Sequence, residues 1–503
     1  MPTGADSSSV PKPDADANPA RLTKILALRA PGLNEISRDI VISSMLHETQ
    51  EGGVEAIVEW LEGHRQTTQC VVDLVPLRTL DHWHFDEHLN LLHDSGKFFS
   101  IEGLRVSTDA GPVDHWAQPI IYQREIGILG IICQKRHGVL QFLLQAKIEP
   151  GNIGHAQLSP TLQATRSNYT RVHEGQFPAF LDYFVEPVKQ WILFDQLQSE
   201  QGGRFFKKRN RNMLLVIPPE EVLEVPDNFR WMTLGQIKRL VTMNNTINMN
   251  TRTVLSCLSI APFDGSLSSS LREIRADGDD SWRGLYDSLL RREQGLHSLE
   301  SLLSHLTELK TRATLDVERC DLDQLEDWEV REYEIAHRED RFFRVIGVRV
   351  RIDGREVQSW CQPLIRPRHE GLVGFIVRPI DGVYLILVQA KMEAGNFDTL
   401  ELAATVQCIT GNYRRPTYDI PYVQHFLDPQ QGRILFDSMQ SEEGGRFFQE
   451  ENRYLVLEVG EDFPTDVADN YIWMTLGQAK LFIKFNNYFN VEARSLITCF
   501  SPI

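Results

Sequence analysis

The eight residues QAKIEPGN at positions 145–152 recur almost unchanged as QAKMEAGN at positions 389–396. The two copies are separated by 389 − 145 = 244 residues, and the same offset pairs Trp116 with Trp360. Further along, an offset of 444 − 202 = 242 residues relates GGRFF at 202–206 to a second GGRFF. Matches that keep one order over so long a stretch indicate a duplicated domain, because solenoid units repeat every ~20–50 residues.

The duplication predicts two repeats with polar or helical segments before and between them. The first twenty residues are rich in Pro, Ala, Ser and Asp and have no apolar core, which predicts a disordered tail and excludes a signal peptide. Apolar residues at helical spacing precede each repeat. We therefore expect a disordered tail at 1–22, a helical segment at 23–65, repeat one at 66–262, a helical linker at 263–311 and repeat two at 312–503.

The composition narrows the class of protein. With 52 Lys and Arg against 69 Asp and Glu, the 503-residue chain has a formal charge of −17, which argues against a nucleic-acid-binding protein. Hydrophobic residues make up 42% of the chain, enough for buried cores. No apolar run reaches the ~18 residues of a membrane helix. The seven cysteines form no CxxC pair, so a reducing cytoplasm is the expected location.

Strand patterns dominate each repeat. GVLQFLLQAK at 138–147 and GVYLILVQAK at 382–391 are apolar runs that begin with glycine, which is typical of buried strands. WMTLGQ opens a helical stretch in both copies, with Thr233 and Thr475 as the expected N-caps. We therefore expect an α+β fold of two tandem domains, each a mixed sheet flanked by helices.

The end of this strand holds the first candidate site. Alternation places Gln145, Lys147 and Glu149 on one face, and the second copy repeats the arrangement. This polar face is either a solvated edge or the wall of a ligand pocket. Because both copies retain it, we give the two interpretations equal weight. The equivalent residues of repeat two are Gln389, Lys391 and Glu393.

The segment that follows is rich in small, polar and basic residues, which suit a loop around a ligand. Guanidinium groups bind diphosphate oxygens in bidentate fashion, so this loop is a candidate anion site. The alternative is a surface loop with salt-bridged arginines. The candidates are Asn152, Arg166, Ser167, Asn168, Arg171 and His173 in repeat one, and Asn396, Tyr413, Arg414 and Arg415 in repeat two.

Two further motifs allow a structural and a functional interpretation. In QSEQGGRFF (198–206) and QSEEGGRFF (440–448) the glycine pair permits positive φ in a tight turn. Glu442 and Arg446 form either a structural ion pair or part of a ligand site. Trp116 and Trp360 are either core residues or platforms for a nucleobase.

The long phrases QLSPTLQATRSNYTRVH (157–173), QSEEGGRFF (440–448) and NVEARSL (490–496) resemble the NDP-hexose 2,3-dehydratases, bacterial enzymes that make deoxysugars for antibiotics. The resemblance covers the chain from about residue 25 to its end. It implies two tandem Nudix-like domains, a homodimer, and dTDP-4-keto-6-deoxy-D-glucose as substrate. It also implies loss of water across C2 and C3, giving dTDP-3,4-diketo-2,6-dideoxy-D-glucose for a downstream 3-ketoreductase.

The Nudix signature G-x5-E-x7-R-E-u-x-E-E can be tested directly. Counting from Gly395 places Glu401 at the first carboxylate, but the remaining metal-binding carboxylates are missing in both copies. We therefore expect no metal site and no cofactor. A Nudix-type pyrophosphatase and a nucleotide-sugar-binding protein without catalysis are the alternative functions.

Elimination beside a ketone needs a base, an acid and donors to the enolate oxygen. We expect Glu149 or Glu393 as the base and Lys147 or Lys391 as the donor, and Tyr169 or Tyr413 could replace either. Arginines of the loops would hold the diphosphate. The richer loop of repeat one favours that repeat as the catalytic one.

Overall fold

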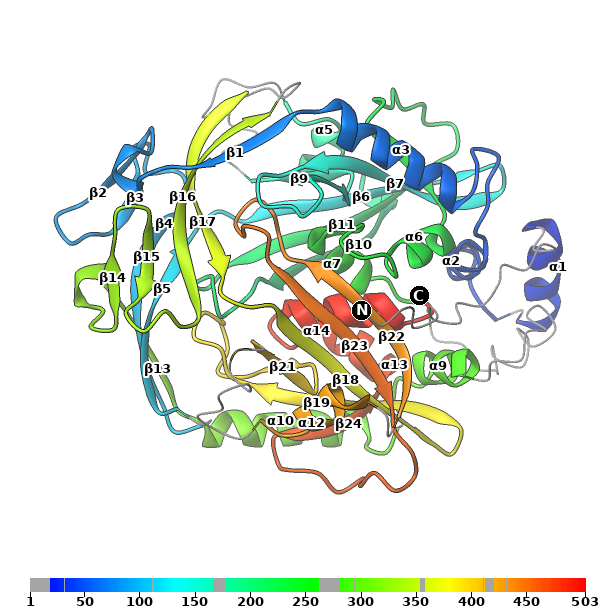
Figure 1. The fold of residues 1–503 in the computed structure, drawn as a ribbon. Coiled ribbons are helices and arrows are strands. Elements are labelled where there is room, and N and C mark those ends of the chain that lie inside the picture. The colour runs from blue at the N-terminus through cyan, green and yellow to red at the C-terminus, as the bar shows by residue number, and fades with distance from the viewer. Residues whose placement is uncertain are drawn as a thin grey trace, which may run out of the picture.

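The computed structural model describes residues 19–30, 32–110, 113–165, 177–261, 281–293, 295–352, 358–409, 411, 420–429 and 432–503. Helices precede both repeats (Figure 1). Before repeat one these are α1 (Pro19–Arg29), α2 (Glu35–Met45) and α3 (Val54–Thr67), and before repeat two they are α9 (Ser281–Leu290) and α10 (Leu299–Arg312). None of the helices in the described ranges is long and apolar enough to cross a membrane.

A seven-stranded mixed sheet forms the centre of each repeat, as the apolar runs predict. In repeat one the path is β10-β11-β6-β7-β12, with β8 on β7 and β9 on β6; β6 and β11 are parallel and the other pairs antiparallel. The bounds are β6 Gly127–Arg136, β7 Val139–Ile148, β8 Ala156–Ser159, β9 Leu162–Ala164, β10 Ile192–Ser199, β11 Arg209–Ile217 and β12 Phe229–Met232.

Repeat two builds the same sheet from the equivalent strands. Its path is β22-β23-β18-β19-β20, with β21 on β18 and β24 on β19, and β18 and β23 are the parallel pair. The bounds are β18 Gly371–Ile380, β19 Val383–Lys391, β20 Glu401–Ala403, β21 Val406–Ile409, β22 Arg433–Ser441, β23 Glu451–Glu458 and β24 Tyr471–Thr475. The predicted α+β class with a mixed sheet in each repeat is confirmed.

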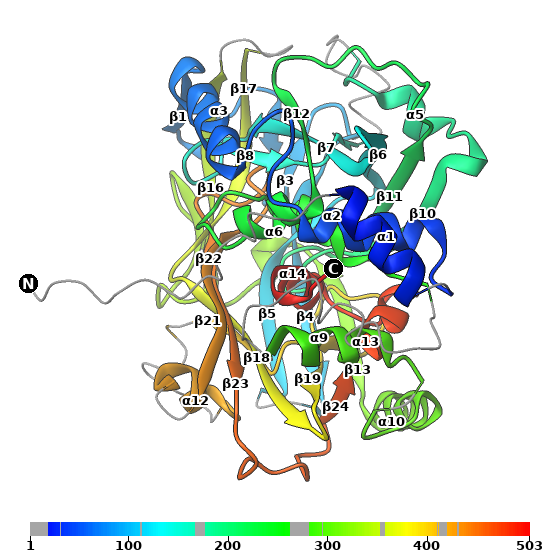
Figure 2. The same cartoon turned by 90° about the vertical axis from the view of Figure 1, so that its right-hand side faces the viewer.

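The WMTLGQ motif begins a helix in both copies, α6 (Leu234–Leu240) and α13 (Leu476–Ile483). Thr233 and Thr475 are N-caps, and each forms a capping box with the glutamine three residues later. The motif requires glycine because the backbone at this position packs closely against the end of α2. A Cβ at Gly235 would lie 2.4 Å from the carbonyl oxygen of Leu46. Figure 2 shows α2 beside α6. Gly477 meets the segment after α9 in the same way.

Two five-stranded sheets join the repeats by exchanging their first strands. β1 (Cys70–Leu74) of repeat one pairs with β16 of repeat two, and β13 (Leu315–Cys320) of repeat two pairs with β4 of repeat one. Because of this strand exchange, each small sheet contains strands from both repeats. The other strands are β2 Trp83–Phe85, β3 Leu91–His93, β4 Ser100–Thr108, β5 His115–Tyr122, β14 Trp328–Val330, β15 Glu334–His337, β16 Phe343–Ile352 and β17 Ser359–Pro367.

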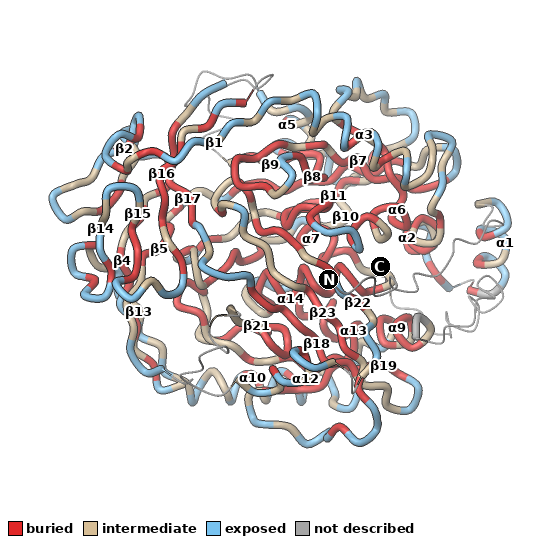
Figure 3. The backbone as a smooth tube through the Cα atoms, in the orientation of Figure 1, coloured by how far each residue is buried: buried red, intermediate tan, exposed pale blue. Residues whose placement is uncertain are grey.

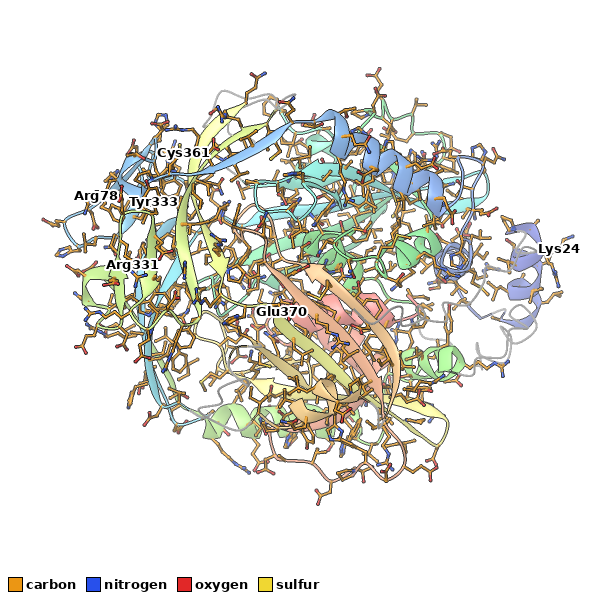
Figure 4. The ribbon with its side chains drawn as sticks, in the orientation of Figure 1. Lys24, Arg78, Arg331, Tyr333, Cys361 and Glu370 are labelled. Carbon is orange, nitrogen blue, oxygen red and sulfur yellow. The ribbon has the colours of Figure 1, made fainter. Side chains whose placement is uncertain are left out.

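Side chains cross between the repeats here as well. The Trp83 indole donates to the carbonyl oxygen of Cys361 (3.0 Å), a residue of β17 that Figure 4 labels. The Trp328 indole donates to the Ala117 carbonyl oxygen (2.9 Å) in the reverse direction. These contacts close one shared apolar core under the two small sheets.

The last helix of each repeat lies at the centre of the molecule, where Figure 3 shows the chain buried. α7 (Met249–Ser256) and α14 (Val491–Phe500) pack together, and the Arg252 guanidinium donates to Ser495 Oγ (2.6 Å). Short helices complete the repeats: α5 (Leu181–Val185) and α12 (Val423–Leu427), with 3-10 turns at Leu77–Thr79, Lys189–Trp191 and Leu322–Gln324.

Candidate active site

The polar strand ends form one ion pair in each repeat. Lys147 Nζ lies 3.3 Å from Glu149 Oε1, and Lys391 Nζ lies 3.0 Å from Glu393 Oε1. The two glutamates are buried, so their charge has to be compensated by close partners. A glutamine supports each one: Gln163 donates to Glu149 (2.8 Å) and Gln407 to Glu393 (3.1 Å).

The second oxygen of each glutamate has no partner. Oε2 of Glu149 and Oε2 of Glu393 are buried and accept no hydrogen bond from the described residues. A buried acceptor without a donor is costly in a stable fold but fits a base that awaits a substrate proton.

The glycine-rich turn of each repeat lies against the strand end of the other repeat. The Gly151 amide donates to the Gly444 carbonyl oxygen (2.8 Å), and the Gly395 amide donates to the Gly202 carbonyl oxygen (2.7 Å). The approach is so close that a Cβ at Gly151 would lie 1.6 Å from the Phe447 carbonyl oxygen. Each candidate site is therefore built from both repeats.

The explanation of the glycine pair by positive φ is wrong. None of the four glycines in the two turns has a positive φ. Instead, the first glycine of each pair leaves room for an asparagine, because a Cβ at Gly444 would lie 2.1 Å from Asn152 Oδ1 and one at Gly202 would lie 2.0 Å from Asn396 Oδ1. The burial of Asn152 and Asn396 under these turns favours a structural role for both.

Buried arginines from the central helices hold the turns. Arg252 donates to the Ser441 carbonyl oxygen (2.8 Å), and Arg494 donates to the Ser199 carbonyl oxygen (2.7 Å). The serine hydroxyls then reach the partner repeat. Ser441 bonds to Gln157, and Ser199 bonds to Glu401, each at 2.8 Å.

We define two clusters, each made of a lysine–glutamate pair, its glutamine and the equivalent two residues of the turn that lies against it. The N-terminal cluster consists of Lys147, Glu149, Gln163, Glu443 and Arg446, and the C-terminal cluster consists of Lys391, Glu393, Gln407, Gln201 and Arg204.

Glu443 was not among the residues predicted from the sequence, although a signal was present. It is the one position at which the QSE-x-GGRFF turns differ, with Gln201 in the other copy. A Cβ at Gly445 would lie 2.9 Å from Glu443 Oε1 and 3.6 Å from Glu149 Oε1. Both carboxylates therefore lie near one point beside this glycine, whereas no atom of the described residues lies within 4 Å of the same point at Gly203.

The carboxylates around the clusters have raised pKa values. Burial raises the pKa of Glu443 to about 7, and the neighbouring Glu149 and Glu200 raise it as well. Burial also raises the pKa of Glu401 to about 7 and that of Glu492 well above its ordinary range. Glu492 lies near Glu393 of the C-terminal cluster, whose charge raises the pKa of Glu492 further.

A Glu442–Arg446 ion pair is not present. Glu442 accepts hydrogen bonds from Asn452 and from Gln201 of the other turn, and burial raises its pKa to about 8. The Arg446 guanidinium instead lies over the Phe99 ring, 4.2 Å from its centroid. The N-terminal cluster therefore includes a half-buried cation that packs on an aromatic ring.

The remaining predicted residues take varied places. Gln145 donates to the Pro160 carbonyl oxygen (2.9 Å), which gives it a structural partner, and Gln389 occupies the matching position on β19. Trp116 and Trp360 are half-buried rather than fully enclosed in the core. The Trp360 indole donates to Gln362 (2.7 Å), which donates to the Gly445 carbonyl oxygen (2.8 Å) beside the N-terminal cluster.

Several predicted ligands cannot be placed. Arg166, Ser167, Asn168, Tyr169, Arg171, His173, Tyr413, Arg414 and Arg415 lie outside the described residues. Both segments directly follow strands whose glutamines, Gln163 and Gln407, belong to the clusters.

One group among the described residues has ligand atoms close enough to share a metal ion, His88 with Asp321 and Asp323. It lies between the small sheets, away from both clusters, and its groups bond to one another and to Asn90. It forms no part of the candidate active site.

The geometry defines a tandem-repeat α+β protein with two related acid–base clusters. The family model of NDP-hexose 2,3-dehydratases matches residues 54–258 and 299–500, and the chain belongs to this family.

Relatives support the same assignment, and all three carry the name dTDP-4-dehydro-6-deoxy-alpha-D-glucopyranose 2,3-dehydratase. The chain is 42% identical to one from Saccharopolyspora spinosa over 87% of its length and 89% of the relative. It is 38% identical to one from Amycolatopsis orientalis, over 94% and 96%. It is 40% identical to one from Streptomyces violaceoruber, over 84% and 91%.

Proposed function

We propose that this chain removes water across C2 and C3 of dTDP-4-keto-6-deoxy-D-glucose, and that the N-terminal cluster performs the reaction. The substrate follows from the names of the relatives, which act on the 4-dehydro sugar. The choice of cluster rests on its residues. The observation that carries it is that Glu401 and Glu492 lie near Glu393, whereas the matching residues of the other copy are the neutral Gln157 and Asn250.

The reaction begins with the proton on C3, which the neighbouring 4-ketone acidifies. Glu149 would accept this proton on Oε2, the buried oxygen to which none of the described residues donates. Negative charge then develops on O4, and the Lys147 ammonium, next to Glu149, would stabilise it. Loss of the C2 hydroxyl as water gives an enol, which tautomerises to the 3,4-diketone.

The C-terminal cluster is less suited to an enolate. Glu401 and Glu492 lie near Glu393 there; burial is the main cause that raises the pKa of each, and the charge of Glu393 raises both further. The N-terminal equivalents are neutral amides: Gln157, which takes the place of Glu401, and Asn250 at 492 − 242 = 250. An additional anion is therefore less costly beside Lys147 than beside Lys391.

Arg446 and the loop arginines Arg166 and Arg171 are the proposed partners of the diphosphate, and Trp360 is the proposed partner of the base. Tyr169, Ser167, Asn168 and His173 complete the set that the loop would supply. No metal or cofactor is assigned a role. A cytoplasmic homodimer that passes its unstable product to a 3-ketoreductase completes the proposal.

The test is incubation of the purified chain with dTDP-4-keto-6-deoxy-D-glucose, with a trapping ketoreductase and NADPH, with and without EDTA. The expected result is loss of one water from the sugar at a rate that EDTA does not change. Release of thymidine monophosphate that depends on Mg²⁺ would instead indicate a pyrophosphatase. Tight binding without turnover would indicate a binding protein, and either result would overturn the proposal.

A further inference from the structure

The N-terminal cluster contains a carboxylate from the other repeat for which the mechanism above has no role. Glu443 belongs to the turn of repeat two, yet its Oε1 and that of Glu149 both lie within 4 Å of the point that a Cβ on Gly445 would occupy. Elimination also requires an acid, because a hydroxyl group leaves poorly unless it is protonated as it departs. We propose that Glu443 is this acid, delivered across the repeat interface to the C2 hydroxyl. The inference rests on the proposed function.

Three observations separate Glu443 from its counterpart. Its side chain remains partly exposed, whereas Gln201 is 4% exposed and donates to Glu442. Among the described residues no atom lies within 4 Å of the matching point next to Gly203, so Gln201 and Glu393 do not share such a point as Glu443 and Glu149 do. A glutamine side chain also cannot release a proton at neutral pH. The C-terminal cluster therefore has the base and the lysine but no acid at the position that corresponds to Glu443.

The environment of Glu443 suits a proton donor. Burial and the nearby carboxylates of Glu149 and Glu200 raise its pKa to about 7, so a large share of the protein carries the proton near neutral pH. The Lys147 ammonium pairs with Glu149. Adjacent carboxyl groups held in different protonation states are a common solution for acid and base roles in one site.

The protons balance over the whole cycle. Glu149 takes the proton from C3, the electron pair moves to O4, and the C2–O bond breaks as Glu443 transfers its proton to the departing oxygen. The resulting enol carries a hydroxyl on C3. When this enol tautomerises, its C3 hydroxyl releases a proton to Glu443, and C2 accepts the proton that Glu149 holds. Both glutamates are then back in their starting states.

A partial reaction separates the acid from the base. In D₂O, a working base exchanges the C3 proton of the substrate with solvent even when the C2 hydroxyl cannot leave. Glu443→Gln is the appropriate variant, because the other turn already has glutamine at this position. We expect it to lose water-forming turnover by about 10²-fold or more, with an unchanged Tm and retained deuterium exchange at C3. Glu461→Gln, an exposed position outside the clusters, is the matched control.

The outcomes are distinguishable. Normal turnover by Glu443→Gln, or parallel loss of turnover and exchange, would overturn the role of Glu443 while leaving the proposed function intact. The proposed function itself would fail if wild-type protein neither exchanged C3 nor released water. As a second readout, the pH limb of kcat that falls as Glu443 ionises should be absent from the residual activity of Glu443→Gln, and its persistence would contradict the assignment.

Discussion

The N-terminal and C-terminal clusters share a frame and differ in charge. Both have an ion-paired lysine and glutamate, a supporting glutamine, and a turn from the other repeat. Three positions around this frame differ in their residues. Near the N-terminal cluster they are Gln157, Asn250 and Glu443, and near the C-terminal cluster they are Glu401, Glu492 and Gln201. Duplication therefore kept the contacts that hold the repeats together and changed the residues that control protons.

The largest difference between the clusters should appear when the lysines are removed. Lys147→Met keeps the length of the side chain but removes the donor to the developing enolate, which should lower kcat by about 10²–10³-fold. Steady-state kinetics of the coupled assay measures this effect.

Lys391→Met should give the opposite pattern. Burial alone lowers the pKa of Lys391, but Glu393 and Glu492 raise it above its ordinary value, so this cation mainly compensates neighbouring carboxylates. We expect a lower Tm and a kcat within a few-fold of wild type. A larger loss of kcat in Lys391→Met than in Lys147→Met would reverse our assignment of the clusters.

The shared frame predicts equal effects in the two repeats. A Cβ at Gly151 would lie 1.6 Å from the Phe447 carbonyl oxygen, and a Cβ at Gly395 would lie 1.8 Å from that of Phe205. Gly151→Ala and Gly395→Ala should each destabilise the fold by about 3 kcal/mol, measured by urea unfolding.

Gly63→Ala is the control for the two glycine variants. Gly63 lies in α3 with open space where its Cβ would be, so alanine should stabilise the protein by up to about 1 kcal/mol. A large difference between Gly151→Ala and Gly395→Ala would show that the repeats are not joined symmetrically.

The carboxylates of the C-terminal cluster predict a pH dependence of stability. Burial raises the pKa of Glu401 from 4.5 to about 7, so between these values the folded state keeps a proton that the unfolded state releases. Stability therefore falls as pH rises through this range, by roughly 3 kcal/mol at most from this group. Glu401→Gln should flatten that part of the profile, and a profile parallel to wild type would be inconsistent with the raised pKa.

Charge exchange between the clusters should have the smallest effect. Gln157→Glu gives the N-terminal cluster the carboxylate of the C-terminal one, next to the same serine contact. We expect kcat to fall about tenfold, because a new negative charge opposes the enolate. Glu401→Gln should leave kcat unchanged, and an unchanged kcat in Gln157→Glu would mean that these carboxylates do not control the choice of cluster.

Much of the frame could be predicted from the sequence, because strand and cap signals are local. The apolar run that ends in QAK became β7 and β19, and Thr233 and Thr475 became N-caps with capping boxes. Lys147 and Glu149 lie close together because the alternation of β7 (Val139–Ile148) continues to the residue after its end.

The composite nature of the site could not be predicted in this way. Exchange of β1 and β13 and the placement of each turn against the other repeat depend on contacts between residues far apart in the chain. The local spacing of Glu442 and Arg446 permits an ion pair, yet each contacts partners that lie far away in the chain. Glu443 could have been found only by asking why one position of a duplicated motif differs.

The most direct test of our central claim compares Glu149→Gln with Glu393→Gln in one experiment, measuring deuterium exchange at C3 and release of water from dTDP-4-keto-6-deoxy-D-glucose. The N-terminal assignment predicts that Glu149→Gln loses both by about 10²–10⁴-fold, while Glu393→Gln stays within a few-fold of wild type. Loss of exchange in Glu393→Gln with normal exchange in Glu149→Gln would contradict it.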